Sequence, residues 1–170
     1  MVSKGKIQIR PIETKDNEHM ERIIKRSLES VGLDIPGTAY FDPQLGQLAE
    51  YYAVLPKANY WVLVDENDAV LGGVGIAPFE GQEDTCELQK LYLANEAKGQ
   101  GLSRILMETA LEFAVQHYRF CYLETMQKLA IANKVYTKFG FELLDEPLPG
   151  SDHGTMDAWY LKRLNKNREG

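Results

Sequence analysis

The stretch that most constrains the fold is a strand-like segment, a glycine-containing loop and a long helix in direct succession. Residues 86–93 alternate in polarity as a half-buried strand does, and residues 102–117 carry apolar side chains at helical spacing. Between them, Gly99 and Gly101 let the backbone turn tightly and approach a ligand closely. A helix that begins near Gly101 presents unpaired N–H groups and the positive end of its dipole. The segment therefore predicts an anion site, and a pyrophosphate suits it.

The loop alone leaves a purely structural interpretation open, because many glycine pairs before a helix form only a tight turn. It lacks the Gly-Lys-Ser/Thr ending of a Walker loop, and it lacks the third glycine of a dinucleotide-binding fingerprint. Nucleoside triphosphates and dinucleotides are therefore disfavoured as ligands.

The rest of the chain alternates between strand and helix patterns in the order β-α-α-β-β-β-α-β-α-β-β. Strands are expected at residues 6–10, 60–64, 69–76, 86–93, 119–125, 140–144 and 155–164, and helices at 14–31, 42–55, 102–117 and 129–139. No repeat or long linker interrupts this pattern. We expect one α/β domain over residues 1–165 and a frayed tail over 166–170.

Composition excludes several classes of function. The formal charge of −6 disfavours a nucleic-acid-binding protein, which needs clustered Lys and Arg. No apolar run reaches the roughly 20 residues that span a bilayer, and no signal-peptide pattern follows the basic N-terminus. We therefore expect a cytoplasmic protein, with Cys86 and Cys121 reduced and buried. No spacing of His, Cys, Asp and Glu indicates a metal site.

Two blocks of sequence resemble the GNAT superfamily of acetyl-CoA-dependent N-acetyltransferases. The first runs from Glu87 to Ser103 and contains the family's loop, Arg/Gln-x-x-Gly-x-Gly/Ala, with Glu96 at the first position. The second, residues 132–141, is similar to Ala-x-x-x-Tyr-x-x-x-Gly-Phe. Shorter similarities indicate a bacterial subgroup of acetyltransferases without implying a substrate. The resemblance implies the GNAT fold, of class α/β (α+β): a mixed, mostly antiparallel sheet of six or seven strands flanked by about four helices.

The resemblance also implies how acetyl-CoA, the acyl donor, is bound without a metal. Backbone groups of Leu91 and Leu93 would hold the thioester carbonyl and the pantetheine arm. Asn133 would lie near the pantetheine, although it could equally be a solvated helix residue. The pyrophosphate would be bound by Lys98, Gly99, Gln100, Gly101, Leu102 and Ser103. Ser103 could add its hydroxyl or be an ordinary residue of the first helical turn.

Two residues are candidates for proton transfer. Tyr136 occupies the position of the family's recurrent tyrosine, which protonates the departing thiolate, but it could instead pack its helix against the sheet. Glu87 is the candidate base, acting directly or through water, because period-two alternation would place it with Gln89 and Leu91 on one side of the strand. It could equally be a glutamate at the rim, paired with a cation such as Lys90.

Other assignments stay open at the level of sequence. Glu124 is a second candidate base, while His153 and Tyr40 are candidate contacts of the acceptor. The acceptor is expected to be a primary amine of a small molecule, amino acid, peptide or protein. The alternative function is an acyl-CoA-binding sensor or scaffold without turnover, and a longer acyl donor is a further alternative. A homodimer is plausible by the same resemblance.

Overall fold

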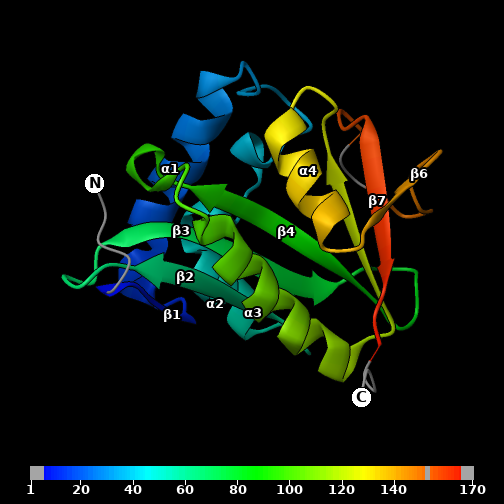
Figure 1. Ribbon diagram of the computed structural model, residues 1–170, viewed down its shortest axis with the longest axis horizontal. Helices are drawn as coiled ribbons and strands as arrows, with labels where there is room; N and C mark the ends of the chain where they lie inside the picture. The colour runs from blue at the N-terminus through cyan, green and yellow to red at the C-terminus, as the bar shows by residue number, and fades with distance from the viewer. Residues whose placement is uncertain (1–5, 152–153, 166–170) are drawn as a thin grey trace.

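Seven strands form one sheet, in the order β1-β2-β3-β4-β5-β7-β6, in the computed structural model, which describes residues 6–151 and 154–165 (Figure 1). The strands are β1 (Gln8–Pro11), β2 (Asn59–Val64), β3 (Val70–Pro78), β4 (Thr85–Leu93), β5 (Phe120–Thr125), β6 (Glu142–Leu144) and β7 (Ala158–Arg163). Only β4 and β5 pair in parallel, and every other neighbouring pair is antiparallel. The expected mixed, mostly antiparallel sheet is confirmed.

Helices cover both faces of this sheet (Figure 1). They are α1 (Asn17–Ser30), α2 (Leu48–Ala53), α3 (Leu102–His117) and α4 (Ala130–Lys138). One core layer lies under α3 and α4 and includes Leu63, Ile76, Leu106, Met107 and Leu123. The other lies under α1 and α2 and includes Met20, Ile24, Leu48, Tyr52 and Tyr60. Within residues 6–151 and 154–165, no helix has the length and apolar character needed to cross a membrane.

The first helix ends where the sequence predicts. Gly32 has φ +74°, and its N–H donates to Glu29 O at 3.1 Å. The next N–H, from Leu33, donates back to Leu28 O at 2.8 Å. These bonds form a Schellman motif, which favours glycine because of its left-handed backbone. The helix begins later than expected, at Asn17, because a separate 3-10 turn occupies Thr14–Asp16.

The predicted helix over residues 42–55 is wrong in its first half. Two 3-10 turns, Ala39–Phe41 and Leu45–Gln47, precede α2, which has only six residues. The Asp42 carboxylate accepts a hydrogen bond from Lys90 Nζ on β4, at 2.8 Å. This contact holds the segment before α2 against β4, and residues 42–47 do not join the helix.

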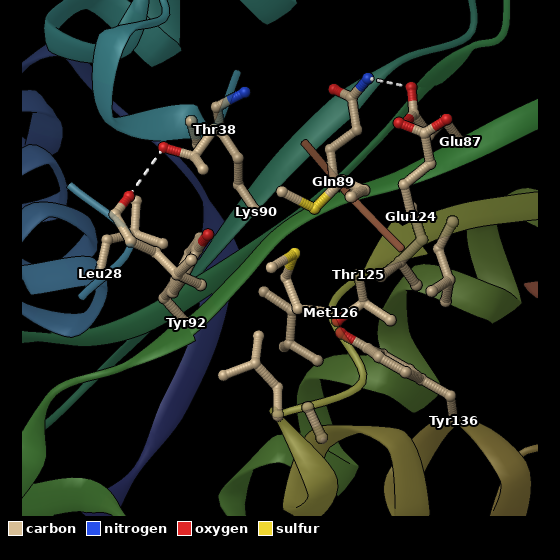
Figure 2. A pocket seen from close by; sticks show the side chains of 18 residues that line it. Leu28, Thr38, Glu87, Gln89, Lys90, Tyr92, Glu124, Thr125, Met126 and Tyr136 are labelled. Atoms are coloured by element: carbon tan, nitrogen blue, oxygen red, sulfur yellow. Dashed lines mark hydrogen bonds between the residues drawn. The ribbon is translucent and has the colours of Figure 1, made fainter. Parts of the chain in front are cut away.

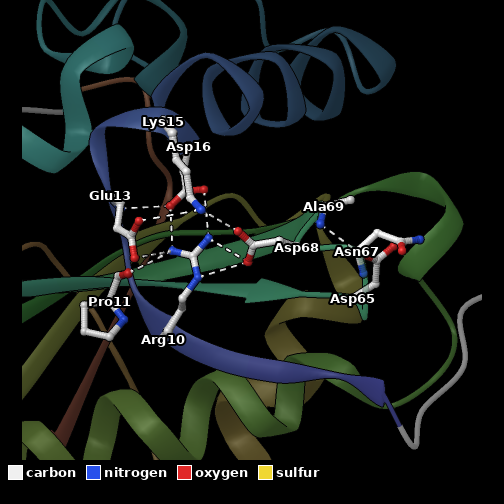
Figure 3. Close-up of polar contacts among 9 residues, drawn as sticks. All are labelled: Arg10, Pro11, Glu13, Lys15, Asp16, Asp65, Asn67, Asp68 and Ala69. Atoms are coloured by element: carbon white, nitrogen blue, oxygen red, sulfur yellow. Dashed lines mark hydrogen bonds and ion pairs between the residues drawn. The ribbon is translucent and has the colours of Figure 1, made fainter.

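An ion-pair cluster ties β1 to the start of α1 and to the β2–β3 turn (Figure 3). The Arg10 guanidinium donates to both carboxylate oxygens of Asp16, at 2.8 and 3.0 Å, and to Asp68 at 3.1 Å. Asp16 is buried and also accepts from the Glu13 N–H at 2.8 Å. Paired carboxylates raise the pKa of Arg10 above its ordinary value. The cluster thereby fixes where the first helix leaves the sheet.

Candidate active site

The two central strands part in the middle of the sheet. Their pairing is limited to Thr85 with Phe120, Cys86 with Cys121 and Glu87 with Tyr122. Beyond that point β4 continues to Leu93 and β5 continues to Thr125, but the two strands no longer pair with each other. A cavity of about 130 Å³ lies there, between the strands and the N-terminal end of α4 (Figure 2). Its lining includes Glu87, Gln89, Leu91, Glu124, Met126, Leu129, Ala132 and Tyr136.

A β-bulge in β4 changes which side chains share a face. Gly73 pairs with Tyr92 and Gly75 pairs with Gln89, so both Lys90 and Leu91 lie opposite Val74. Lys90 has φ +52°, a backbone conformation that residues other than glycine rarely adopt. The irregularity is therefore built into the strand immediately before the part that borders the open cleft.

The bulge corrects the expectation that Glu87, Gln89 and Leu91 lie on one side of the strand. Leu91 and Leu93 pack with Leu88 in the layer under α3 and α4. Gln89 instead contacts Tyr52 in the layer under α1 and α2. Simple alternation fails because the extra residue shifts the phase by one.

The backbone of β4 after the bulge has one edge on the cleft. The Ala94 N–H donates to Leu71 O of the β3 side at 2.8 Å. Because successive residues of a strand direct their backbone groups to opposite edges, those of Leu93 and Leu91 point toward β5. No β5 residue pairs with them, since the pairing of the two strands ends at Glu87. Their N–H and C=O groups are thus placed to bind an extended ligand.

The glycine loop leads directly into α3. Gly99 and Gly101 have φ of +76° and +73°, and Gly101 is the N-cap residue of the helix. A Cβ added at either glycine would meet no atom within 4 Å, so the space beside the backbone is open. The N–H groups of the first turn, which includes Leu102 and Ser103, have no acceptor within the helix. Gln100 and Ser103 are half-buried, the Lys98 side chain is exposed, and Leu102 is buried in the core.

Tyr136 extends from α4 toward the cavity between the strands (Figure 2). Its ring packs against Phe141 and Tyr160, with centroids 6.2 and 5.9 Å apart. Burial raises the pKa of the Tyr136 hydroxyl to about 12, so the phenol is protonated at neutral pH. A buried phenol at this place can donate a proton or a hydrogen bond into the cavity.

Asn133 lies one turn before Tyr136 on the same helix. Its Nδ2 donates to Met126 O at 3.1 Å, which fixes the orientation of the amide. Its Oδ1 is buried and has no hydrogen-bond partner among the residues that the structure describes. Because a buried acceptor without a partner is costly, this atom favours a ligand that supplies an N–H.

The two candidate bases lie close to each other, Glu87 on β4 and Glu124 on β5 (Figure 2). Glu87 Oε1 accepts from Gln89 Nε2 at 2.9 Å on β4. Glu124 Oε2 accepts from the Tyr122 hydroxyl at 2.8 Å and from the hydroxyl of Ser151. Both glutamates also line a larger hollow of about 790 Å³ that adjoins the first cavity. The remaining walls of this hollow include Phe41, Asp42, Tyr51, Phe79, Glu80 and Lys90.

One predicted acceptor contact, Tyr40, does not join this set, and the other, His153, is not tested. The Tyr40 hydroxyl donates to Glu29 Oε2 on α1 at 2.6 Å, and its neighbour Phe41 lines the hollow instead. His153 lies outside the described residues. The sequence did not indicate a site role for Tyr52, because a tyrosine at helical spacing is typical of a core residue. It also did not indicate that Asp42 is the partner of Lys90. Neither contact has a local sequence signal.

Comparison with known proteins supports one family. The model of the acetyltransferase (GNAT) family matches residues 20–141. An uncharacterized N-acetyltransferase of Escherichia coli, YjgM, is 36% identical over 159 residues, which cover 92% of this chain and 94% of that protein.

Solved structures share the fold. An acetyltransferase of the GNAT family from Staphylococcus aureus has a TM-score of 0.78 at 18% identity, covering 94% of this chain and 99% of that one. The spermidine N-acetyltransferase of Vibrio cholerae, solved with CoA and spermine, has a TM-score of 0.71 at 15% identity and covers 95% and 97%. At these identities the likeness concerns the fold alone.

Proposed function

The chain belongs to the acetyltransferase (GNAT) family, and from that premise we propose that it transfers an acetyl group from acetyl-CoA to a primary amine by direct attack on the thioester. The observation that carries the proposal is that Glu87 and Tyr136 line the same cavity, at the point where β4 and β5 part. A base and an acid that line one cavity are the two proton-transfer groups that aminolysis of a thioester needs.

The geometry supports acetyl-CoA as the donor. The N–H groups from Gly99 to Ser103 would bind the pyrophosphate, helped by the Ser103 hydroxyl and the exposed Lys98 ammonium. The orphaned Asn133 Oδ1 would accept an amide N–H of the pantetheine arm. The Leu91 N–H would donate to the thioester oxygen, and one such donor contributes about 3 kcal/mol to stabilising an oxyanion.

In the proposed reaction the amine nitrogen bonds to the thioester carbon, and the carbon–sulfur bond then breaks. The ammonium first loses one proton to solvent, which frees the nitrogen lone pair, and Glu87, directly or through one water, takes the second proton that the nitrogen loses as the amide forms. Tyr136 gives its hydroxyl proton to the departing sulfur, a role consistent with its pKa of about 12, because the phenol is protonated at neutral pH. The products are the acetamide and CoA, and solvent returns Glu87 and Tyr136 to their starting states.

The acceptor would enter through the larger hollow. Its described walls include the carboxylates of Asp42, Glu80, Glu87 and Glu124, of which Asp42 is paired with Lys90. An amine arrives in water as an ammonium ion, and such walls favour its entry. The proposal therefore covers amines of small molecules, amino acids, peptides or proteins, with Glu87 at the junction of the two cavities.

The test is release of the CoA thiol from acetyl-CoA across a panel of amines, amino acids and peptides, with Glu87→Gln, Glu124→Gln and Tyr136→Phe beside the parent. Loss of about 10²–10⁴-fold in kcat is expected for Glu87→Gln and Tyr136→Phe, with acetyl-CoA still bound. Tyr118→Phe is the matched control. The Tyr118 hydroxyl donates to Lys57 O at 2.6 Å, and Tyr118 lines neither cavity.

Three outcomes would count against the proposal. Acetyl-CoA binding without thiol release on any acceptor would indicate a binding module. A large loss in Glu124→Gln with none in Glu87→Gln would transfer the base role to Glu124. Undetectable binding of acetyl-CoA to the parent would remove the glycine loop as its site.

A further inference from the structure

We infer that Gln89 and Tyr52 are positioning residues that hold the Glu87 carboxylate at the junction of the two cavities. This inference rests on the proposed role of Glu87 as the base. It extends the active site to α2, a helix that contributes Tyr52 without touching the cavity between the parting strands.

The contacts form a directed chain of hydrogen bonds. The Tyr52 hydroxyl donates to Gln89 Oε1 at 2.5 Å, and Gln89 Nε2 donates to Glu87 Oε1 at 2.9 Å (Figure 2 shows the second bond). An ionised carboxylate only accepts, so the amide must direct its nitrogen to Glu87 and its oxygen to Tyr52. The hydroxyl must then be the donor. Each group in the chain therefore has a single productive orientation.

Tyr52 is itself held firmly. It is 2% exposed, and its ring lies against Tyr51 and Tyr60, with centroids 5.1 and 5.4 Å apart. A Cβ at Gly75 of β3 would lie 2.7 Å from the Tyr52 hydroxyl, so the glycine leaves the space that the phenol occupies. Burial raises the pKa of Tyr52 well above its ordinary value, which keeps the hydroxyl protonated as a donor.

The surroundings of Glu87 give the amide a specific task. Among the residues that the structure describes, the ionisable groups that line the same hollow or lie beside Glu87 include Asp42, Tyr51, Glu80, Lys90, Tyr122 and Glu124, from five parts of the fold. Lys90 Nζ is bonded to Asp42 at 2.8 Å. A neutral N–H donor stabilises the ionised form of Glu87 against the neighbouring carboxylates and adds no charge that would repel an incoming ammonium.

The first measurement is the titration of Glu87 by carbon NMR of labelled glutamate side chains in the unliganded protein, with its signal assigned through Glu87→Gln. Gln89→Leu removes the donor, and we expect the pKa of Glu87 to rise by roughly one unit, which corresponds to one charge-assisted hydrogen bond. Tyr52→Phe keeps the amide but frees its rotation, so a smaller rise is expected. Gln89→Glu places a second carboxylate next to that of Glu87 and should raise the pKa of Glu87 most.

Gln82→Leu is the matched control, because Gln82 donates to Pro149 O at 3.4 Å and does not line either cavity. It should leave the titration of Glu87 unchanged. An unchanged Glu87 pKa in both Gln89→Leu and Tyr52→Phe, with circular dichroism showing that the variants are folded, would overturn the inference.

The second measurement links the chain to turnover. In Gln89→Leu the acid limb of kcat/KM should move to higher pH by the same amount as the NMR titration, while the KM for acetyl-CoA stays unchanged. An NMR shift without a shift of the acid limb would remove Glu87 as the base and Gln89 as its positioning residue, leaving acetyl transfer itself intact. A parent that acetylates no amine would refute the proposed function, and the NMR titration would still decide whether Gln89 controls Glu87.

Discussion

The Tyr60 hydroxyl donates a hydrogen bond to the carbonyl oxygen of Lys90, at 2.8 Å. This contact holds the bulge of β4 from the face of the sheet that α1 and α2 cover. Tyr60 is fully buried, on β2, and β3 lies between it and the bulge. The phenol reaches across β3 because Gly73 has no side chain, and a Cβ there would lie 2.4 Å from the Tyr60 ring. The shape of the cleft thus depends on a residue that does not line it.

Tyr60→Phe should therefore lower both stability and activity. Removing the hydroxyl leaves the Lys90 carbonyl without this donor, which costs about 1–3 kcal/mol of unfolding free energy in urea titrations. Tyr118→Phe also loses a bond from a phenol to a backbone carbonyl, at 2.6 Å to Lys57 O. It should cost similar stability but leave kcat/KM unchanged. Equal kinetic losses in the two variants would show that the Tyr60 contact has no special link to the cleft.

Gly75→Ala should be destabilising by about 1–3 kcal/mol, as expected when a methyl group is forced into a filled space. Its Cβ would lie 2.7 Å from the Tyr52 hydroxyl and from the Tyr60 ring, both fixed by packing. Gly154→Ala, at a glycine with no atom within 4 Å of its added Cβ, is the control and should be close to neutral. Thermal unfolding followed by circular dichroism compares the two. A neutral Gly75→Ala would mean that the tyrosines can move apart.

Ser103→Asp separates ligand binding from stability, because its two effects have opposite signs. A carboxylate in the first turn of α3 interacts favourably with the helix dipole, so the melting temperature should be equal or higher. The same charge would repel a pyrophosphate, and the Kd for acetyl-CoA should rise by about tenfold or more in calorimetry, which corresponds to about 1.4 kcal/mol. S-acetylpantetheine, which has no pyrophosphate, should bind the parent and the variant equally. An unchanged Kd for acetyl-CoA would place the pyrophosphate elsewhere.

The pH profile tests the protonation state of Tyr136. Because burial raises the pKa of its hydroxyl to about 12, the phenol should remain protonated across the working range. Activity should rise with pH as the base and the amine lose protons, and it should show no descending limb up to about pH 10. Initial rates of CoA release, corrected for spontaneous thioester hydrolysis, measure this profile. A descending limb near pH 9 that disappears in Tyr136→Phe would contradict a pKa this high.

Local signals predicted most elements well. The apolar spacing of residues 102–117 predicts α3 with its observed bounds, because its buried positions, such as Leu106 and Ala110, recur on one face. The bounds of β4 and β5 differ by one residue at most from the pattern of alternation. The placement of β7 between β5 and β6 has no local signal, because it depends on how the chain returns to the sheet.

The candidate site was only partly predictable. At positions 99 and 101 the residue type, glycine, already indicates a positive φ, and both residues have one. Lys90 also has positive φ, but nothing about a lysine in an alternating strand indicates it. The expected alignment of Glu87 with Leu91 failed for that reason. The contact of Tyr60 with the bulge and that of Tyr52 with the Gln89 side chain join segments far apart in the chain and become visible only in the folded structure.

The bulge of β4 also bears on how such a strand tolerates changes in length. The extra residue at Lys90 puts Gln89 and Leu91 on different faces of the sheet. As a result, β4 contributes polar side chains to the larger hollow and unpaired backbone groups to the cleft beside β5. Deleting Lys90 would restore simple alternation and leave Leu91 and Leu93 in the same layer as Leu88, but it would remove the residue whose carbonyl the Tyr60 hydroxyl binds. The extra residue therefore changes the path of the strand beside the cleft and leaves the leucines of β4 in one core layer.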